Sequence, residues 1–403
     1  NKDVPHDWLN DSVKPRIEGD WVWATGTTLG ADNGMGVATA MSILQSKDIP
    51  HGPVEALFTI DEETGMTGAK ALKPGLLHGD ILLNLDSEAE GELYIGCAGG
   101  LDTSVEFKYS TELLPKDYQT FILAVKGLRG GHSGMEIHEG RANANKLLAR
   151  LILPLMRNCG ARLISIEGGT LRNAIPRECE AVIAIPADKV RKASRTVKDI
   201  TSEMTVEYRP IDAGLNVIFE KTKAQRRAID AAIAFNAIQA IYVCPCNVDR
   251  MSLEIPGLVE TSNNLAVVKS EKGKITVKTL MRGSIDSAKH DLRDKIRAVF
   301  ELAGASRIAF TGGYSGWMPN SNSEILRLMK ETYRKMYGQE PKVMAIHAGL
   351  ECGILSGAYP HWDMISFGPT LMSPHSPDER CYIPSVEKFW NFLLEVIRNI
   401  PEK

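Results

Sequence analysis

Two apolar runs that each end in acidic residues constrain the fold most. The run from Val54 to Ile60 leads into Asp61-Glu62-Glu63, and the run from Asp80 to Leu85 leads into Asp86. Both are short and apolar, so we predict two buried β-strands. Sites in open α/β sheets lie beyond the carboxyl ends of strands. The two acidic ends therefore predict one shared site in an α/β domain.

A glycine-rich turn places another acid before a helix. Asp32 lies within the stretch Leu29 to Gly36, and the spacing of apolar residues from Asn33 to Gln45 predicts a helix buried on one face. A carboxylate on such a turn can face a bound cation, because glycines let the backbone come close. The stretch alone is equally typical of a plain packing turn.

Histidine joins the acids near the end of the chain, where His375 follows the predicted strand Asp363 to Phe367. Zinc accepts both carboxylate oxygen and imidazole nitrogen. Taken singly, each acid is more often a helix cap or a solvated strand end. Their recurrence at the ends of apolar runs favours a metal centre.

Two cations about 3.5–4 Å apart polarise a carbonyl and generate hydroxide together, and one carboxylate must bridge them. Asp32 is suited to bridge. Glu63, Asp86 and His375 are then the terminal ligands. Glu62 is next to a ligand but points differently, so it is the candidate general base.

Length, charge and cysteine usage narrow the class of protein. A chain of 403 residues can form two domains, and a net charge of −3 provides no basic field for nucleic acid. No apolar run is long enough to span a bilayer, and Asn1-Lys2-Asp3 is not typical of a signal peptide. The seven scattered cysteines indicate reduced thiols. We expect a cytoplasmic protein without nucleic-acid or membrane partners.

After Gly99-Gly100 the apolar residues follow the alternating pattern of strands, and after Gly312 the α/β pattern of the first part returns. We predict a catalytic α/β domain formed by residues 1–100 and 314–403, with an α+β lid domain, 101–313, inserted between them. The lid's predicted strands are 103–107, 120–125, 161–166, 181–185, 265–268, 274–281 and 307–310, and its predicted helices are 143–157, 223–241 and 287–302.

Nine motifs carry a resemblance that covers essentially the whole chain: T-T-L-G-A-D-N-G, D-E-E-T-G-M, N-L-D-S-E-A-E-G, G-C-A-G-G, G-L-R-G-G-H-S-G, T-L-R-N-A-I-P-R, E-T-S-N-N, I-H-A-G-L-E-C-G and G-P-x-x-x-S-P-H-S-P-D-E. The set resembles the di-zinc metallopeptidase superfamily of carboxypeptidases, aminoacylases and carnosinases, and within it the bacterial aminoacyl-histidine (Xaa-His) dipeptidases. The resemblance implies a zinc-peptidase-like mixed sheet flanked by helices, and a homodimer. It also implies hydrolysis of small dipeptides, including beta-alanyl-histidine, with two Zn²⁺ ions that Co²⁺ or Mn²⁺ can replace.

The resemblance also implies roles for the metal-site residues. Asp32 matches the bridging ligand, and the peptide bond after it is typically cis in the family. Glu62 matches the general base. Glu63, Asp86 and His375 match the remaining ligands.

Further matches lie in the lid and are assigned to substrate binding. His132 matches the histidine that approaches the scissile carbonyl oxygen, often from the partner subunit. Asn173 and Arg282 match polar lid positions, and Arg282 is suited to hold a substrate carboxylate bidentately. Asn264 is a weaker match. Gly349 lies where relatives approach that carboxylate with backbone N–H groups.

The chain departs from the family pattern in two places, and one further residue has no role in that pattern. Leu350-Glu351 replaces the small hydroxyl residue and Asp common after Gly349, and His347 has no assignable role, so a structural histidine is as good a reading. Relatives also carry an H-x-D motif before the region where this chain begins, and His6-Asp7-Trp8 matches its pattern only loosely. We therefore expect the N-terminal part of the catalytic domain to be absent, and the chain as written to be a poor enzyme. The alternatives are another dipeptidase or aminoacylase of the superfamily, or an impaired metal-binding remnant.

Overall fold

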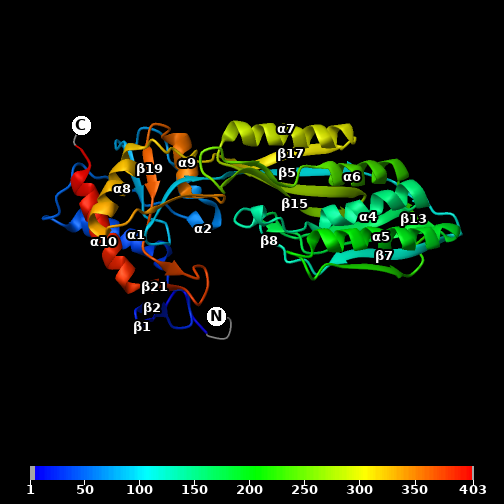
Figure 1. Ribbon diagram of the computed structural model, residues 1–403, viewed down its shortest axis with the longest axis horizontal. Helices are drawn as coiled ribbons and strands as arrows, with labels where there is room; N and C mark the ends of the chain where they lie inside the picture. Colours follow the sequence, from blue (N-terminus) through cyan, green and yellow to red (C-terminus); the bar gives the residue numbers. More distant parts are fainter. Residues whose placement is uncertain (1–4, 402–403) are drawn as a thin grey trace. The chain divides into compact units, whose positions relative to one another are not determined.

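The computed structural model describes residues 5–401, so the expectation about Asn1-Lys2-Asp3 lies outside the described part. The chain forms two compact units (Figure 1). The first comprises the described residues up to Cys97, then Trp317–Ile346, and then the chain from Leu350. The second comprises Ala98–Gly316 together with His347–Gly349.

The first unit is built on a mixed four-stranded sheet in the order β18-β4-β19-β3. β18 runs parallel to β4 and β19 parallel to β3, whereas β19 and β4 are antiparallel, which confirms the expected mixed sheet. The strands are β3 Ile81–Asn84, β4 Glu92–Cys97, β18 Lys342–Ile346 and β19 Asp363–Ser366, and the longer helices of the unit are α1 Ala31–Gln45, α8 Glu324–Tyr337, α9 Glu351–Ala358 and α10 Ile383–Asn399.

A second, antiparallel sheet of the first unit joins the first of its three sequence segments to the last. Its order is β1-β2-β21-β20, with β1 Pro15–Glu18, β2 Trp21–Ala24, β20 Leu371–Met372 and β21 Arg380–Tyr382. The loop between β20 and β21 carries His375. This sheet therefore places the predicted histidine ligand close to the early part of the chain.

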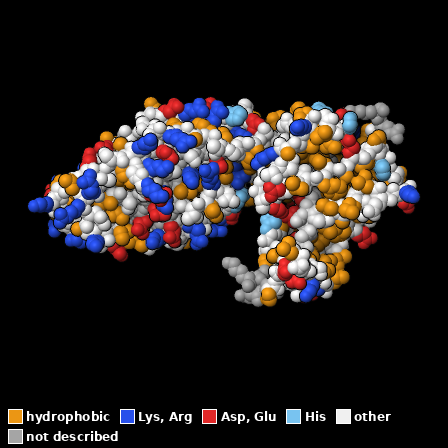
Figure 2. Space-filling view, turned by 180° about the vertical axis from the view of Figure 1, so that it is seen from behind, with side chains coloured by type: hydrophobic (Ala, Val, Ile, Leu, Met, Phe, Trp, Pro, Cys, Tyr) orange, Lys and Arg blue, Asp and Glu red, His pale blue; other side chains and the backbone are white. Residues whose placement is uncertain are grey.

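The predicted strand from Val54 to Ile60 is wrong. The segment joins no strand ladder with any residue in 5–401, and Val54, Phe58 and Ile60 are 41%, 49% and 73% exposed. Figure 2 shows apolar side chains, in orange, on the surface of this unit. A strand needs a neighbour that pairs with its backbone groups, and an apolar pattern cannot test whether that neighbour exists.

The second unit is an α+β structure around a nine-stranded antiparallel sheet. The strands are, in order, β12 Asn216–Lys221, β7 Tyr118–Lys126, β11 Cys179–Pro186, β9 Arg162–Gly168, β15 Val259–Glu271, β16 Lys274–Gly283, β5 Gly99–Lys108 and β17 Arg307–Tyr314, with β14 Asn247–Met251 paired to β15. The helices α4 Ala144–Cys159, α5 Val190–Tyr208, α6 Ala231–Val243 and α7 Asp286–Leu302 contact the sheet (Figure 1). Leu148, Leu151 and Ile152 of α4 are fully buried in its core.

Two helices of this unit differ from the prediction. The predicted helix 223–241 begins only at Ala231, because Oδ1 of Asp230 caps it by accepting the N–H of Ile233 at 3.0 Å. Residues Arg227–Ile229 form strand β13 instead. The helix α5 was not anticipated, since only three of its side chains are buried: Ala193, Val197 and Met204. So narrow an apolar face gives a weak periodic signal.

The described residues carry no disulfide, and all seven cysteines are free. None of the helices within residues 5–401 has the length and apolar character needed to cross a membrane. Basic and acidic side chains are interspersed on the visible face of the second unit (Figure 2).

Tyr359 anchors a loop to the end of α9. Its hydroxyl accepts the N–H groups of Leu76 and Leu77 at 3.0 and 3.1 Å and donates to the carbonyl of Lys73 at 2.8 Å. The ring is 2% exposed and stacks on Trp362 with centroids 4.0 Å apart. One phenol therefore satisfies three backbone groups.

We expect Tyr359→Phe to lower the free energy of unfolding by about 1–3 kcal/mol, because it leaves those backbone groups without their partner. Urea denaturation measures the change. Tyr242→Phe is the control, since Tyr242 is 45% exposed. Equal effects of the two substitutions would show that the hydroxyl of Tyr359 contributes nothing specific.

Candidate functional site

Three of the predicted metal ligands converge in the first unit. Nε2 of His375 lies 2.9 Å from Oδ2 of Asp32 and 3.0 Å from Oε2 of Glu63. Their donor atoms lie within 4.8 Å of one another, and residues 5–401 contain no other such group of three. Two carboxylates and one imidazole form a donor set that suits zinc.

The backbone around Asp32 is irregular. Gly30 has φ 77°, and the dihedral angles of Asp32 and Asn33 are not helical although they lie within the bounds of α1. The peptide bond between Asp32 and Asn33 is cis, which confirms the expectation from the family pattern. The regular helix therefore begins after the acid, and Asp32 lies on the turn that precedes it.

Glu379 holds this turn. Its carboxylate accepts four backbone N–H groups, from Leu29 at 2.7 Å, Gly30 at 2.9 Å, Ala31 at 2.8 Å and Asp32 at 3.2 Å. The residue is 2% exposed. The sequence pattern predicted no role for Glu379, although it stands in the same short motif as His375. One carboxylate thus links the Asp32 turn to the segment that carries the histidine.

A second acidic turn presents Glu62 and Glu63. Asp61 has φ 66° and precedes the short helix α2, Glu62–Gly65. Its carboxylate accepts the hydroxyl of Thr64 in α2 and that of Thr67, the first residue of the helix α3, Thr67–Ala71. Successive helical residues point about 100° apart, so Glu63 can contact His375 while Glu62 points elsewhere. Burial, followed by the charge of Glu63, raises the pKa of Glu62 to about 7.

Asp86 follows β3 and lies beside Asp32. Its N–H donates to Oδ1 of Asn84 at 3.2 Å, and the same oxygen accepts the hydroxyl of Ser366 on the parallel strand β19 at 2.6 Å. Burial, followed by the Asp32 carboxylate, raises the pKa of Asp86 to about 8, and the two carboxyl groups share a hydrogen bond.

The charges of this cluster fit a bound cation. Oδ1 of Asp86 is buried without a hydrogen-bond partner among the described residues. Burial and the Asp32 carboxylate also raise the pKa of Glu63. Burial lowers the pKa of His375, but Glu63 and Asp32 outweigh it and raise the pKa overall. Acids packed this closely repel one another unless a cation compensates them.

Two further acids interact with the cluster, and sequence reasoning gave them no role. Glu351, at the start of α9, is 8% exposed, and its charge contributes to the raised pKa of Glu62. Burial and then the charge of Asp32 raise the pKa of Glu88. In the sequence, Glu351 is visible only as a departure from the family pattern. That departure was the one signal that could have pointed to its place beside the cluster.

The predicted substrate-binding residues lie together in the second unit. The short strand β8, Gly131–His132, pairs with β10, Ala174–Ile175. The carbonyl of Asn173 accepts the N–H of Ser133 at 2.8 Å. The buried side chain of Asn264 donates to the carbonyls of Arg172 and Ala174 at 3.0 and 2.8 Å. Its amide therefore holds the segment 172–174, which leads into β10, in place.

Arg282 and His347 lie close to His132 and Gly134. Arg282 is 6% exposed, and no carboxylate in the described part of the chain pairs with it. Nε2 of His347 lies 2.7 Å from Oγ of Ser262, and burial, followed by the charge of Arg282, lowers the pKa of His347 to about 3. A neutral, buried histidine supports the structural reading of His347. At Gly349, a Cβ would lie 2.9 Å from the hydroxyl of Tyr314, so any larger residue would require the Tyr314 side chain to shift.

The predicted site residues therefore form two groups, each within one unit. His6-Asp7, the loose match to the missing motif, lies ahead of the turn 8–10 and outside any strand.

Comparison with known proteins gives matches along the whole chain. Residues 3–399 match the model of peptidase family M20/M25/M40. The cytosol non-specific dipeptidase of Escherichia coli K12 is 43% identical over 403 residues, which cover 100% of this chain and 83% of that protein. The crystal structure of the aminoacylhistidine dipeptidase from Vibrio alginolyticus superposes with a TM-score of 0.95 at 45% identity, covering 100% of this chain and 82% of that one. The aminopeptidase PepT of Bacillus cereus shares the fold alone. It superposes with a TM-score of 0.50 at 16% identity, covering 96% of this chain and 76% of that one.

We expect Glu379→Gln to weaken Zn²⁺ binding on the order of 10- to 100-fold, because the amide nitrogen would face backbone N–H groups and displace the Asp32 turn. Competition with a chromogenic chelator measures the affinity. Glu55→Gln is the matched control: Glu55 also accepts two backbone N–H groups in the same unit, those of His78 and Gly79. Unchanged affinity in Glu379→Gln would show that the turn needs no such support.

Proposed function

This chain belongs to peptidase family M20/M25/M40, and from that premise we propose that it is a metal-dependent dipeptidase whose substrates include Xaa-His dipeptides such as beta-alanyl-histidine. Two relatives support the substrate class: one is named a non-specific dipeptidase and the other an aminoacylhistidine dipeptidase. In this proposal the first unit is the catalytic domain and the second unit is the lid that binds substrate.

The observation that carries the proposal is the convergence of Asp32, Glu63 and His375, with Glu62 next to them. These three would hold a divalent cation, and Asp86 would contribute to a second position beside Asp32. A cation bound there supplies Lewis-acid activation of water and of the peptide carbonyl. We propose Zn²⁺ as the metal, with Co²⁺ or Mn²⁺ as substitutes.

Glu62 would act as the general base. It would take a proton from the attacking water and return it to the amine that leaves. Burial is the main cause of the raised pKa of Glu62, and it makes this carboxylate a better proton acceptor than an exposed one. His132 would donate a hydrogen bond to the carbonyl oxygen as negative charge develops on it.

Location and assembly are part of the proposal. The free cysteines and the cytosolic relative support a cytoplasmic location. The family resemblance supports a homodimer, in which His132 serves the partner's site.

We expect Glu62→Gln to keep its metal and to lose at least about 10²-fold in kcat, because the amide preserves the shape of the residue but cannot accept the proton. Hydrolysis of beta-alanyl-histidine and metal content per chain are measured on the same samples. Glu55→Gln controls for the loss of one carboxylate elsewhere in the unit. If a fully metal-loaded Glu62→Gln protein hydrolyses dipeptides at the normal rate, another group activates the water.

Arg282 is the candidate anchor for the substrate's free carboxylate. A buried guanidinium without a carboxylate partner is costly, so an anionic ligand is the natural compensation. Burial, followed by the Arg282 charge, lowers the pKa of His132, so the two groups lie close enough to serve one substrate. A bidentate guanidinium would fix the carboxylate in position as well as attract it.

We expect Arg282→Ala to weaken the binding of a dipeptide with a free carboxylate by about 2–3 kcal/mol, since a charge-assisted contact is lost. The same dipeptide with an amidated C-terminus should be affected far less. The ratio of kcat/KM for the two substrates is compared in wild-type and variant proteins. Equal losses for both substrates would rule out this role.

A further inference from the structure

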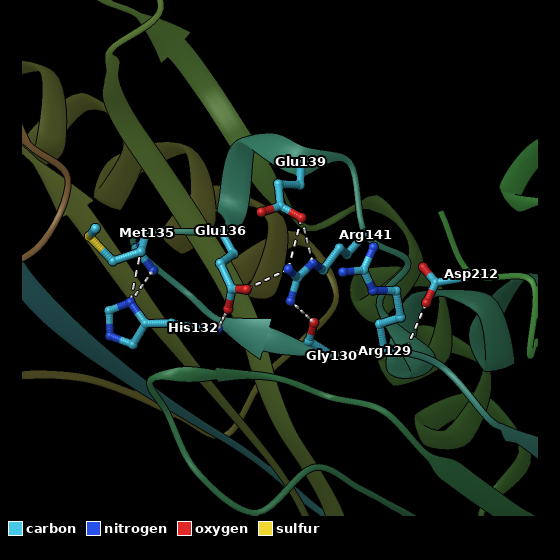
Figure 3. A network of polar contacts seen from close by, with 9 residues as sticks. Arg129, Gly130, His132, Met135, Glu136, Glu139, Arg141 and Asp212 are labelled. Atoms are coloured by element: carbon cyan, nitrogen blue, oxygen red, sulfur yellow. Dashed lines mark hydrogen bonds and ion pairs between the residues drawn. The ribbon is translucent and has the colours of Figure 1, made fainter. Parts of the chain in front are cut away.

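A short loop carries His132, and its own backbone fixes the ring. The loop spans residues 129–142, and the N–H groups of Gly134 and Met135 both donate to Nδ1 of His132, at 3.2 and 3.0 Å (Figure 3). A nitrogen that accepts from N–H groups must hold a lone pair, so the proton of the neutral ring resides on Nε2. The loop therefore presents His132 as a hydrogen-bond donor through Nε2.

Glu136 fixes the backbone turn from which Gly134 and Met135 donate to the His132 ring. Its Oε2 accepts the backbone N–H of His132 at 2.6 Å, and its own N–H donates to the carbonyl of His132 at 3.2 Å. The two hydrogen bonds fix the backbone on both sides of the His132 side chain. The N–H groups of Gly134 and Met135 lie within this closed turn and so point at the ring.

Arg141 holds Glu136 in turn. Its side chain is 8% exposed, and its guanidinium pairs with Glu136 and Glu139 and donates to the carbonyl of Gly130 at 2.5 Å (Figure 3). A Cβ at Gly131 would lie 2.1 Å from Nη1 of Arg141 and 2.6 Å from Oε2 of Glu136. The ion pair thus packs directly on the backbone that precedes His132, where the residue must be glycine.

The ends of the loop are fixed separately. Asp212 is 1% exposed, and its two oxygens accept the N–H groups of Arg129 and Ala142 at 2.7 and 2.8 Å. The base of the loop therefore does not depend on the Glu136–Arg141 pair. Removing the pair should loosen the turn around His132 and leave the ends of the loop in place.

We propose that Glu136 and Arg141 are positioning residues that hold His132 as the Nε2–H tautomer, with that N–H aimed as the donor to the substrate's carbonyl oxygen. The inference rests on the proposed function, in which His132 supplies this hydrogen bond. A donor of this kind lowers the barrier only if it is oriented before charge develops. A displaced group of this kind can lower the rate by up to about 10²-fold.

The kinetic test uses Arg141→Met and Glu136→Gln in the full chain. Each should lower kcat for beta-alanyl-histidine, by up to about 10²-fold, with little change in KM, because the donor acts mainly as charge develops. The matched control is Arg150→Met, which removes a partly buried arginine of the same unit that pairs with Glu203 and Glu207. Wild-type kcat in both loop variants, or an equal loss in Arg150→Met, would overturn the proposal.

The spectroscopic test needs no turnover, so it separates this inference from the proposed function. Protein labelled with ¹⁵N-histidine is examined by NMR, and the spectrum of His132→Gln assigns the His132 signals. The wild-type ring should be a single Nε2–H tautomer, and both loop variants should show a mixture of tautomers while Arg150→Met does not. An Nδ1–H tautomer in the wild type, or an unchanged single tautomer in both loop variants, would overturn the inference. A chain that hydrolyses no dipeptide but shows the expected tautomers would overturn only the proposed function.

Discussion

A single buried carboxylate, that of Glu379, holds together the part of the first unit that bears the candidate ligands. It accepts four consecutive backbone N–H groups around Asp32 and lies four residues after His375. Hydrogen bonds to an ionised acceptor are stronger than neutral ones, so this one group can hold a turn whose backbone is not helical. The convergence of Asp32, Glu63 and His375 depends on that turn being in place.

The candidate site residues of the two units carry uncompensated charges of opposite sign. In the first, Asp32, Glu63 and Asp86 crowd together, and burial, followed by the charge of Asp32, raises the pKa values of Glu63 and Asp86. In the second, Arg282 is buried without a carboxylate partner in the described chain. Unpaired buried charge is costly, and a protein retains it where a ligand supplies the opposite sign. A divalent metal and a peptide carboxylate are ligands of the required signs.

Precise placement in both units comes from backbone N–H groups rather than from side chains alone. Four of them orient the Asp32 turn through Glu379, and two orient the ring of His132. Such contacts fix a direction as well as a distance, which a flexible surface ion pair does not. The peptidase fold thus supplies rigid supports close to the groups that are proposed to act.

The sequence by itself determined the kinds of residue at the centre, because acids at the ends of apolar runs and one late histidine are visible as a pattern. It also determined most strands of the second unit, where alternation is strong, and the helices whose apolar face is wide. It could not determine that Val54–Ile60 lacks a pairing neighbour, or that α5, with three buried side chains, is a helix. Only the tertiary structure revealed Glu379, which bonds Leu29 from 350 residues away. The pattern within a short window of sequence indicates which residues are buried and which element they favour. It does not indicate which residues hundreds of positions apart become neighbours, because the tertiary fold of the whole chain decides that.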